Sequence, residues 1–185
     1  MSRLGVFGGT FDPVHVGHLA IANAALEDIP LDRVLFVPAR RSPLKDAAPV
    51  ATVEDRVAML ERAIAGEARF AICRVEIDRP APSYTVDTLE ALRRDGHDEL
   101  YLIIGSDAYA AFARWKDPAR VRALAHLVVA ARPGAPAPKD ARLLDAPLMD
   151  ISAHELRARA ARGRSLRYLV PEATLRYIEE RHLYR

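Results

Sequence analysis

Short apolar runs alternate with longer helical patterns along most of the 185-residue chain, and this alternation restricts its fold more than any other feature. Because strands that alternate with helices form a parallel sheet covered on both faces, we predict an α/β fold with a doubly wound, mostly parallel sheet. The predicted strands lie at residues 4–7, 34–37, 69–75, 100–104 and 126–131. The predicted helices between them lie at residues 15–26, 53–64 and 86–92.

Two further helical patterns end the chain, after a segment rich in proline and alanine at residues 132–147 that predicts a surface loop. Ser152 predicts the N-cap of the first of these C-terminal helices, and Glu155 completes a capping box. Pro171 suits the first turn of the second. A chain of this length can bury one good core, so we interpret residues 1–185 as a single domain.

Composition excludes several classes of protein. The formal net charge is only +2 and the arginines are spread along the chain, which argues against a grip on long nucleic acid. The single cysteine, Cys73, can form neither an internal disulfide nor a thiolate metal site. The sequence contains no membrane-length apolar stretch, and glycines and Pro13 interrupt any leader-like stretch near its start. We expect a soluble cytoplasmic protein, and the sequence leaves open whether it forms a homo-oligomer.

The most informative stretch, residues 8–18, joins the first strand to the first helix and reads Gly-Gly-Thr-Phe-Asp-Pro-Val-His-Val-Gly-His. A turn from strand to helix directs backbone amides and a helix N-terminus at one ligand, which favours an anion. Gly8 and Gly9 let the backbone approach a phosphate that a side chain would block. His15 and His18 are three residues apart on the first helical turn, so both imidazoles should project to the same side as donors to a polyphosphate.

Other interpretations of this stretch have less support in the sequence. It lacks the Gly-Lys-Ser/Thr ending of a Walker loop and the spaced glycines of a dinucleotide fingerprint. An H-x-x-H pair can bind zinc, but the sequence offers no evident third ligand. For the histidine pair taken alone, a glycine turn beside two surface histidines remains the alternative.

The stretch resembles the G-x-F-x-P-x-H-x-G-H signature of the Rossmann-type nucleotidyltransferase superfamily. The rest of the chain is most similar to bacterial nicotinate-nucleotide adenylyltransferases, nearly from end to end. The similarity rests on several short segments, and because they match the family in order and spacing, they are far more specific together than singly. The resemblance implies transfer of AMP from ATP to nicotinate mononucleotide, giving nicotinate adenine dinucleotide (deamido-NAD) and pyrophosphate, in NAD biosynthesis. The further matching segments lie at residues 81–89, 104–107, 112–115, 151–157, 177–178 and 183–184.

The resemblance also implies two opposed elements that hold the phosphates of ATP. The first is the opening turn, and the second is the I-S-x-x-x-x-R segment that ends at Arg157. Without the family, Arg157 would be read as part of a solvated basic face with Arg159, Arg162 and Arg164. His15, His18 and Arg157 are the expected catalytic residues. The expected ATP-binding residues are Gly8, Gly9, Thr10, Phe11, His15, His18, Lys45, Gly105, Asp107, Ile151, Ser152 and Arg157.

Two of these positions, Lys45 and Asp107, leave alternatives open, as does His154, which is not among the expected site residues. Lys45 matches a family lysine near the phosphates, but Leu44 stands where the family has a histidine, so a merely solvated loop is the alternative. Asp107 follows a buried strand and could accept bonds from ribose hydroxyls, cap a helix, or do both. His154 occupies a position where the family has threonine or serine; it either replaces that hydroxyl as a donor or points outward.

The expected acceptor-binding residues are Tyr84, Thr85 and Trp115. In the family, an aromatic ring at the position of Trp115 stacks on the pyridine ring, and backbone amides near the threonine receive the nicotinate carboxylate. The alternative for a lone tryptophan is a core position. The sequence does not decide between nicotinate and nicotinamide mononucleotide.

Such a reaction needs positioning and charge neutralisation more than a general base, because a phosphate monoester is already ionised at neutral pH. We expect Mg²⁺ to arrive with ATP, held mostly by phosphate oxygens and water, and no protein metal site. The rival functions are a nucleotidyltransferase that acts on phosphopantetheine and a nucleotide sensor without catalysis.

Overall fold

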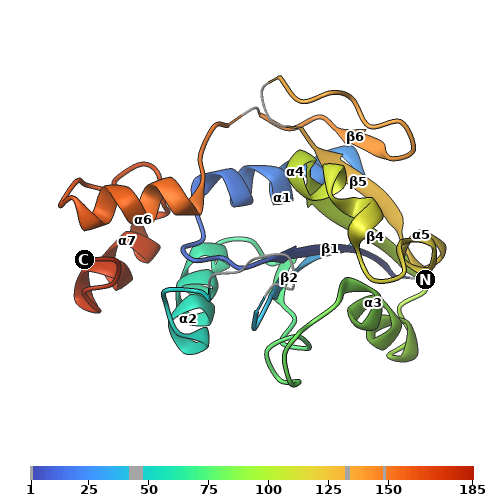
Figure 1. Ribbon diagram of the computed structural model, residues 1–185, viewed down its shortest axis with the longest axis horizontal. Helices are drawn as coiled ribbons and strands as arrows, with labels where there is room; N and C mark the ends of the chain where they lie inside the picture. The colour runs from blue at the N-terminus through green and yellow to red at the C-terminus, as the bar shows by residue number, and fades with distance from the viewer. Residues whose placement is uncertain (1, 42–47, 132–133, 148) are drawn as a thin grey trace.

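The computed structural model describes residues 2–41, 48–131, 134–147 and 149–185. The elements alternate between strand and helix as far as β5, and two helices end the chain (Figure 1). In chain order they are β1 (Arg3–Gly9), α1 (Val16–Asp28), β2 (Arg33–Pro38), α2 (Val53–Ile64), β3 (Phe70–Ile72), α3 (Thr85–Arg94), β4 (Glu99–Gly105), α4 (Ser106–Ala110), the 3-10 turn η1 (Phe112–Arg114), α5 (Pro118–Leu124), β5 (His126–Ala130), β6 (Arg142–Leu144), α6 (Ala153–Ala161) and α7 (Glu172–Glu180).

The strands form one six-stranded sheet in the order β3-β2-β1-β4-β5-β6, and every neighbouring pair is parallel. The first strand therefore lies in the middle of the sheet, between β2 and β4. The chain winds outward from β1 in one direction and from β4 in the other. This arrangement confirms the predicted doubly wound parallel sheet.

Side chains on the central strands alternate between two cores, because successive residues of a strand point to opposite faces. Phe7 and Ile103 pack with apolar residues of α1, α2, α6 and α7, whereas Val6 and Leu102 pack with those of α3 and α5. The continuous apolar run of residues 100–104 is explained by this burial on both faces. The sheet thus has a helical layer on each side.

Several elements differ from the sequence prediction, and helix α5 lies between the strands at residues 100–104 and 126–131, where no helix was predicted. Residues 142–144 form the edge strand β6 inside the segment that predicted only a loop, and Leu144 is its one buried residue. The third strand spans Phe70–Ile72 rather than 69–75. The Cys73 N–H still bonds to the Phe36 carbonyl at 2.9 Å, but a turn then takes the chain away from the sheet.

The C-terminal helices α6 and α7 lie together at one end of the molecule, at the left of Figure 1. The predicted cap of α6 is confirmed, because the Ser152 hydroxyl accepts the Glu155 N–H at 3.2 Å. Pro171 is the N-cap of α7 rather than a residue of its first turn. Within the described ranges, no helix has the length and apolar content needed to cross a bilayer.

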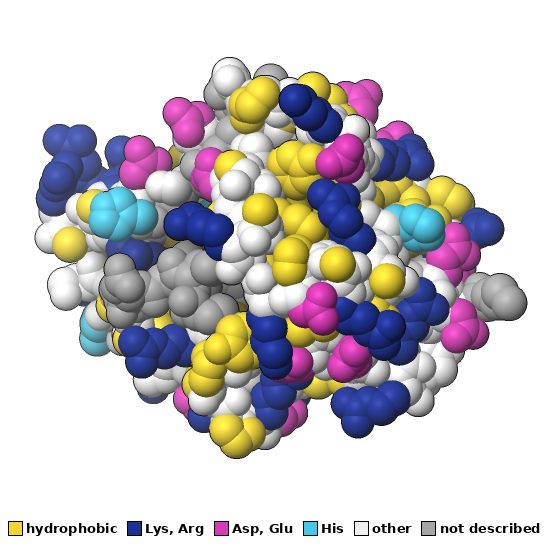
Figure 2. Space-filling model, turned by 45° about the vertical axis from the view of Figure 1, so that its right-hand side comes forward, with side chains coloured by type: hydrophobic (Ala, Val, Ile, Leu, Met, Phe, Trp, Pro, Cys, Tyr) yellow, Lys and Arg dark blue, Asp and Glu magenta, His cyan; other side chains and the backbone are white. Residues whose placement is uncertain are grey.

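Basic and acidic side chains are interspersed on the face seen in Figure 2. Several of the exposed cations of the molecule are paired with carboxylates, among them Arg3 with Glu99 and Arg120 with Glu90. Exposed pairs of this kind contribute little to stability, but they leave a mixed surface rather than a stripe of one sign on this face.

Candidate active site

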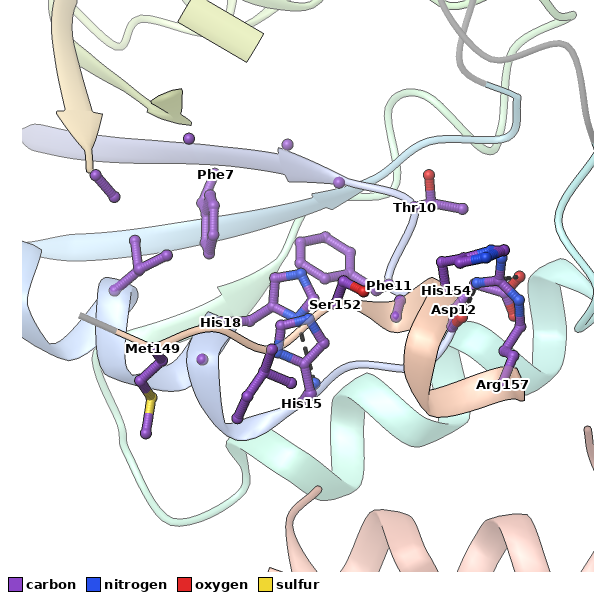
Figure 3. Close-up of a pocket in the computed structure, with 18 of the residues that line it drawn as sticks. Phe7, Thr10, Phe11, Asp12, His15, His18, Met149, Ser152, His154 and Arg157 are labelled. Atoms are coloured by element: carbon purple, nitrogen blue, oxygen red, sulfur yellow. Dashed lines mark hydrogen bonds and ion pairs between the residues drawn. The ribbon is translucent and has the colours of Figure 1, made fainter. Parts of the chain in front are cut away.

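A cavity of about 700 Å³ opens where the central strands β1 and β4 end. This is the point at which the winding of the sheet reverses, where ligands bind in open parallel sheets. Gly8 and Gly9 come from the end of β1 and Gly105 from the end of β4. Helices α1 and α6 begin at the rim, where His15 and Ser152 are their N-caps (Figure 3). Ten predicted site residues line this one cavity: Gly8, Gly9, Thr10, Phe11, His15, His18, Gly105, Ile151, Ser152 and Arg157.

The two histidines of the opening stretch lie side by side in this cavity (Figure 3). Their rings are stacked, with centroids 3.7 Å apart, which confirms that both project to the same side. His15 is not in the first helical turn but is the extended N-cap of α1. Its N–H donates to His18 Nδ1 at 3.2 Å, so a neutral His18 ring carries its proton on Nε2, as a donor.

Glycine is required in the opening turn by close packing. A Cβ on Gly9 would lie 2.9 Å from the Phe11 ring, whereas a Cβ on Gly8 would meet no atom within 4 Å. Phe11 itself adopts a left-handed backbone, φ 49°, and is buried against Phe7 and Phe36. The buried Phe11 ring therefore fixes the turn on the side of the core. Gly8 lines the cavity, and the space beside its Cα is empty.

Helix α6 brings Arg157 to the same cavity from the far end of the sequence. Its Nη1 donates to the backbone carbonyl of Asp12 at 2.7 Å and lies 3.8 Å from the Asp12 carboxylate. Within the described part of the chain both contacts use Nη1, which leaves Nε and Nη2 to a ligand. The guanidinium thus stands across the cavity from the histidines.

Asp12 and Arg56 are structural parts of this site that the sequence did not single out. Both side chains are buried, Asp12 at 2% exposure and Arg56 at 1%. Arg56 Nη1 donates to the carbonyls of Thr10 and Ala39 at 2.7 and 2.8 Å, which ties the opening turn to the end of β2. Burial lowers the pKa of Arg56, and the nearby Asp12 charge opposes that effect.

The predicted acceptor residues lie together but outside the residues that line this cavity. Tyr84 is the N-cap of α3 and Thr85 its first residue. Lys116, the neighbour of Trp115, stands 4.7 Å from the centre of the Tyr84 ring and 3.0 Å from Asp87 on α3. Trp115 is half-buried against Phe112, and its buried Nε1–H has no hydrogen-bond acceptor among the described residues.

A buried polar network holds the start of α3 in place. Thr88 Oγ1 donates to the Glu76 carboxylate at 2.7 Å and accepts from Arg79 at 2.7 Å, while Arg79 also donates to the Tyr84 carbonyl at 3.1 Å. Burial raises the pKa of Glu76, and the Thr88 hydrogen bond and the Arg79 charge partly offset the rise. The network fixes the backbone at Tyr84 from inside the fold.

Comparisons with known proteins identify the family. The cytidylyltransferase-like family model matches residues 6–159. The chain is 50% identical to a probable nicotinate-nucleotide adenylyltransferase of Thermus thermophilus, over 99% of this chain and all of that protein. It is 46% identical to the protein of that name from Roseiflexus castenholzii, over 99% and 98% of the two chains. The chain belongs to the nicotinate-nucleotide adenylyltransferase family. The resemblance predicted from the motifs is confirmed.

Solved structures of nicotinate-nucleotide adenylyltransferases share the fold. A Plasmodium falciparum nicotinic acid mononucleotide adenylyltransferase complexed with APC superposes with a TM-score of 0.83, covering 100% of this chain and 98% of the other. The same enzyme complexed with NaAD gives a TM-score of 0.81. At 16% identity both likenesses concern the fold alone.

Of the expected ATP-binding residues, Asp107 is not among the described residues that line the cavity, whereas His154, which was not an expected site residue, is. Lys45 lies outside the described residues. Asp107 does not cap α4, because Gly105 is the N-cap; its side chain is exposed in the first helical turn and does not line the cavity. His154 lines the cavity from the first turn of α6, one turn before Arg157 (Figure 3).

The described residues offer little to a resident metal ion. No group of three or more His, Cys, Asp or Glu side chains is arranged there to hold one. Among the described residues that line the cavity, Asp12 is the one carboxylate, and its two oxygens already accept three hydrogen bonds. The donors at the cavity are nitrogen groups suited to an anion rather than oxygen ligands suited to Mg²⁺.

Proposed function

We propose that this protein transfers AMP from ATP to nicotinate mononucleotide, releasing pyrophosphate and forming nicotinate adenine dinucleotide, a step of NAD biosynthesis. Relatives named for this reaction match the chain over nearly its full length at 46–50% identity. The observation that carries the proposal is the meeting of His15, His18 and Arg157 around one cavity at the end of β1. Each is a nitrogen donor, and together they suit a polyphosphate.

The reaction is an in-line displacement at the α-phosphorus of ATP. A phosphate oxygen of the mononucleotide forms a new bond to the α-phosphorus, and the bond from the α-phosphorus to the α–β bridging oxygen breaks, so that this oxygen and its electron pair leave with pyrophosphate. The attacking phosphate is already ionised at neutral pH, so no general base is needed. Catalysis is then the alignment of two anions and the neutralisation of their charge.

Each donor has a distinct part in this mechanism. His18, with its Nδ1 engaged by the His15 N–H, presents Nε2–H to the α- and β-phosphates. His15, stacked on it, shares the same side of the triphosphate. Arg157 faces them through Nε and Nη2 and stabilises the charge that accumulates on departing pyrophosphate.

The acceptor is assigned to the region between α3 and η1. The pyridine ring stacks on Trp115, and its carboxylate is received at the start of α3, near Thr85. A helix N-terminus favours a negative group, which favours nicotinate over the neutral nicotinamide.

Magnesium is assigned to the nucleotide substrate, bound by phosphate oxygens and water rather than by the protein.

A direct assay tests the proposal. The purified protein is incubated with ATP and Mg²⁺ together with nicotinate mononucleotide, nicotinamide mononucleotide or phosphopantetheine in parallel, and pyrophosphate and the products are quantified. Pyrophosphate should form fastest with nicotinate mononucleotide, in equal amount with the dinucleotide. Turnover with phosphopantetheine alone, or binding of ATP without turnover with any acceptor, would contradict the proposal.

A further inference from the structure

The Asp12 carboxylate is buried at the cavity, and its two oxygens accept three hydrogen bonds from within the protein. Oδ2 accepts the Val50 N–H at 2.8 Å, and Oδ1 accepts the Ala51 N–H at 3.1 Å and the Tyr184 hydroxyl at 2.7 Å. A buried carboxylate beside a triphosphate would repel it unless its charge were balanced in this way. Asp12 therefore acts on the fold around the cavity, not on the ligand.

Asp12 joins four separate parts of the chain at the rim of the cavity. Its own backbone carbonyl holds Arg157 of α6, and its carboxylate holds the segment that follows Ala48 and Pro49, both of which line the cavity. The fourth part is the end of the chain, through Tyr184. One residue, Asp12, thus contacts the segment after Pro49, the arginine that faces the histidines and the end of the chain.

Tyr184 is held firmly for a penultimate residue. It is 7% exposed, and its backbone has a left-handed φ of 64°, which is unfavourable for a tyrosine and persists only where packing and bonding fix it. Burial, followed by the charge and hydrogen bond of Asp12, raises the pKa of Tyr184 far above its usual value. The phenol therefore stays protonated and donates throughout the physiological pH range.

We propose that Tyr184 and Asp12 are positioning residues for ATP: the phenol holds the carboxylate so that Arg157 keeps its reach toward the phosphates. The Arg157–Asp12 ion pair is loose, at 3.8 Å. Without the hydroxyl, Asp12 gains its missing partner by closing on Arg157, and the guanidinium withdraws from the cavity. The inference rests on the proposed function, since it assigns the affected ligand as the nucleotide of that reaction.

Tyr177 provides a matched control for Tyr184. Its hydroxyl donates to the Asp55 carboxylate at 2.8 Å, a bond of the same chemistry in the same C-terminal region. Asp55 lies in the first turn of α2 and does not line the cavity. Tyr177→Phe thus removes an equivalent phenol–carboxylate bond without touching Asp12.

The experiment compares wild type, Tyr184→Phe and Tyr177→Phe by calorimetric titration with α,β-methylene-ATP and by steady-state kinetics. Tyr184→Phe should weaken binding of the analogue and raise KM for ATP about tenfold, the scale of one hydrogen bond to a charged group, with KM for nicotinate mononucleotide unchanged. Tyr177→Phe should lower Tm but leave both constants at their wild-type values. The titration needs no turnover, so the positioning role is tested even if the acceptor proves to be a different molecule.

Unchanged affinity in Tyr184→Phe, or an equal loss in both variants, would overturn the positioning role and leave the proposed function standing. Failure of the wild type to form dinucleotide would overturn the proposed function instead. The Tm of each variant shows whether it is folded at the temperature of the titration, and a double-mutant cycle of Tyr184→Phe with Arg157→Lys gives a second test. If the hydroxyl acts through Arg157, the two changes are less than additive in binding free energy, whereas independent effects would add.

Discussion

The two halves of the proposed site are built differently. In the phosphate half, two histidines and an arginine from opposite ends of the sequence already surround one cavity, and hydrogen bonds to neighbouring backbone groups fix them. In the acceptor half, Tyr84, Thr85 and Trp115 lie near one another outside that cavity, and packing and a buried network hold them. Hydrogen bonds fix the orientation of the donor side chains in the phosphate half, whereas burial fixes the position of the aromatic rings in the acceptor half.

This difference predicts that substitutions in the two halves will separate kinetically. Changes in the phosphate half should act on the transition state and on ATP, because charge develops there. Changes in the acceptor half should act on binding of the mononucleotide, because stacking is as strong before the reaction as during it. The following experiments test that separation, from the largest expected effect to the smallest.

His18→Ala should lower kcat/KM about 10²–10³-fold, the usual loss for one donor to a developing oxyanion. The ring is the one that receives the His15 N–H, so its removal also frees the start of α1. Steady-state kinetics with both substrates varied measures the loss. Asn23→Ala, on the exposed face of the same helix, is the control and should leave the rate unchanged; a wild-type rate in His18→Ala would remove the histidine from the mechanism.

Arg157→Lys should raise KM for ATP by roughly 10–100-fold, because one or two charge-assisted hydrogen bonds are lost while the charge remains. The contact to the Asp12 carbonyl requires the reach and planarity of the guanidinium. Arg159→Lys, on the same helix and bonded to the Ser165 carbonyl, is the matched control. An equal effect in both variants would show that α6 contributes general positive charge rather than a placed ligand.

Trp115→Ala should raise KM for nicotinate mononucleotide by the equivalent of about 1–3 kcal/mol of stacking, with a smaller change in KM for ATP. Trp115→Phe should restore most of the affinity, since an aromatic face is retained. A larger effect on ATP than on the acceptor would show that Trp115 supports the fold of the phosphate half.

Glu76→Gln should change stability in a pH-dependent way without large effects on turnover. Burial raises the pKa of Glu76 in the folded state above its value in the unfolded state. The contribution of Glu76 to the free energy of unfolding is therefore fully present below the unfolded pKa and is lost as the pH rises through the folded pKa. Glutamine keeps an acceptor for Thr88 but has no charge to desolvate. The Tm of the variant relative to wild type should therefore rise as the pH is raised from below the usual pKa of glutamate to neutral pH. A constant difference, like that expected for Glu54→Gln at an exposed position, would contradict it.

Much of the fold could be predicted from the sequence because the informative residues act locally. The run at residues 100–104, the glycine turn and the Ser152 cap each specify a strand, a turn or a helix start by their neighbours alone. β6 was missed because a three-residue edge strand with one buried side chain has no periodic signal. The shortening of β3 and the capping of α4 by Gly105 depend on where the chain turns next, which the apolar pattern does not encode.

The site was predictable only as far as contiguous motifs extend. His15, His18 and Arg157 are marked by short patterns, and the structure brings them to one cavity. The function of Asp12 depends on Val50, Ala51, Arg157 and Tyr184, and no local pattern links those positions. Arg56 is likewise an ordinary helical arginine in sequence and becomes a buried support only in three dimensions.

The bond between Asp12 and Tyr184 joins residues 172 positions apart, so it forms only when the last turn of the chain has docked. Local opening of that end costs less than global unfolding, yet it would release the rim of the nucleotide cavity. By linkage, a nucleotide that binds only the docked form stabilises it. Amide hydrogens near the C-terminus should consequently exchange more slowly when ATP is bound, although they lie beyond the residues that touch it.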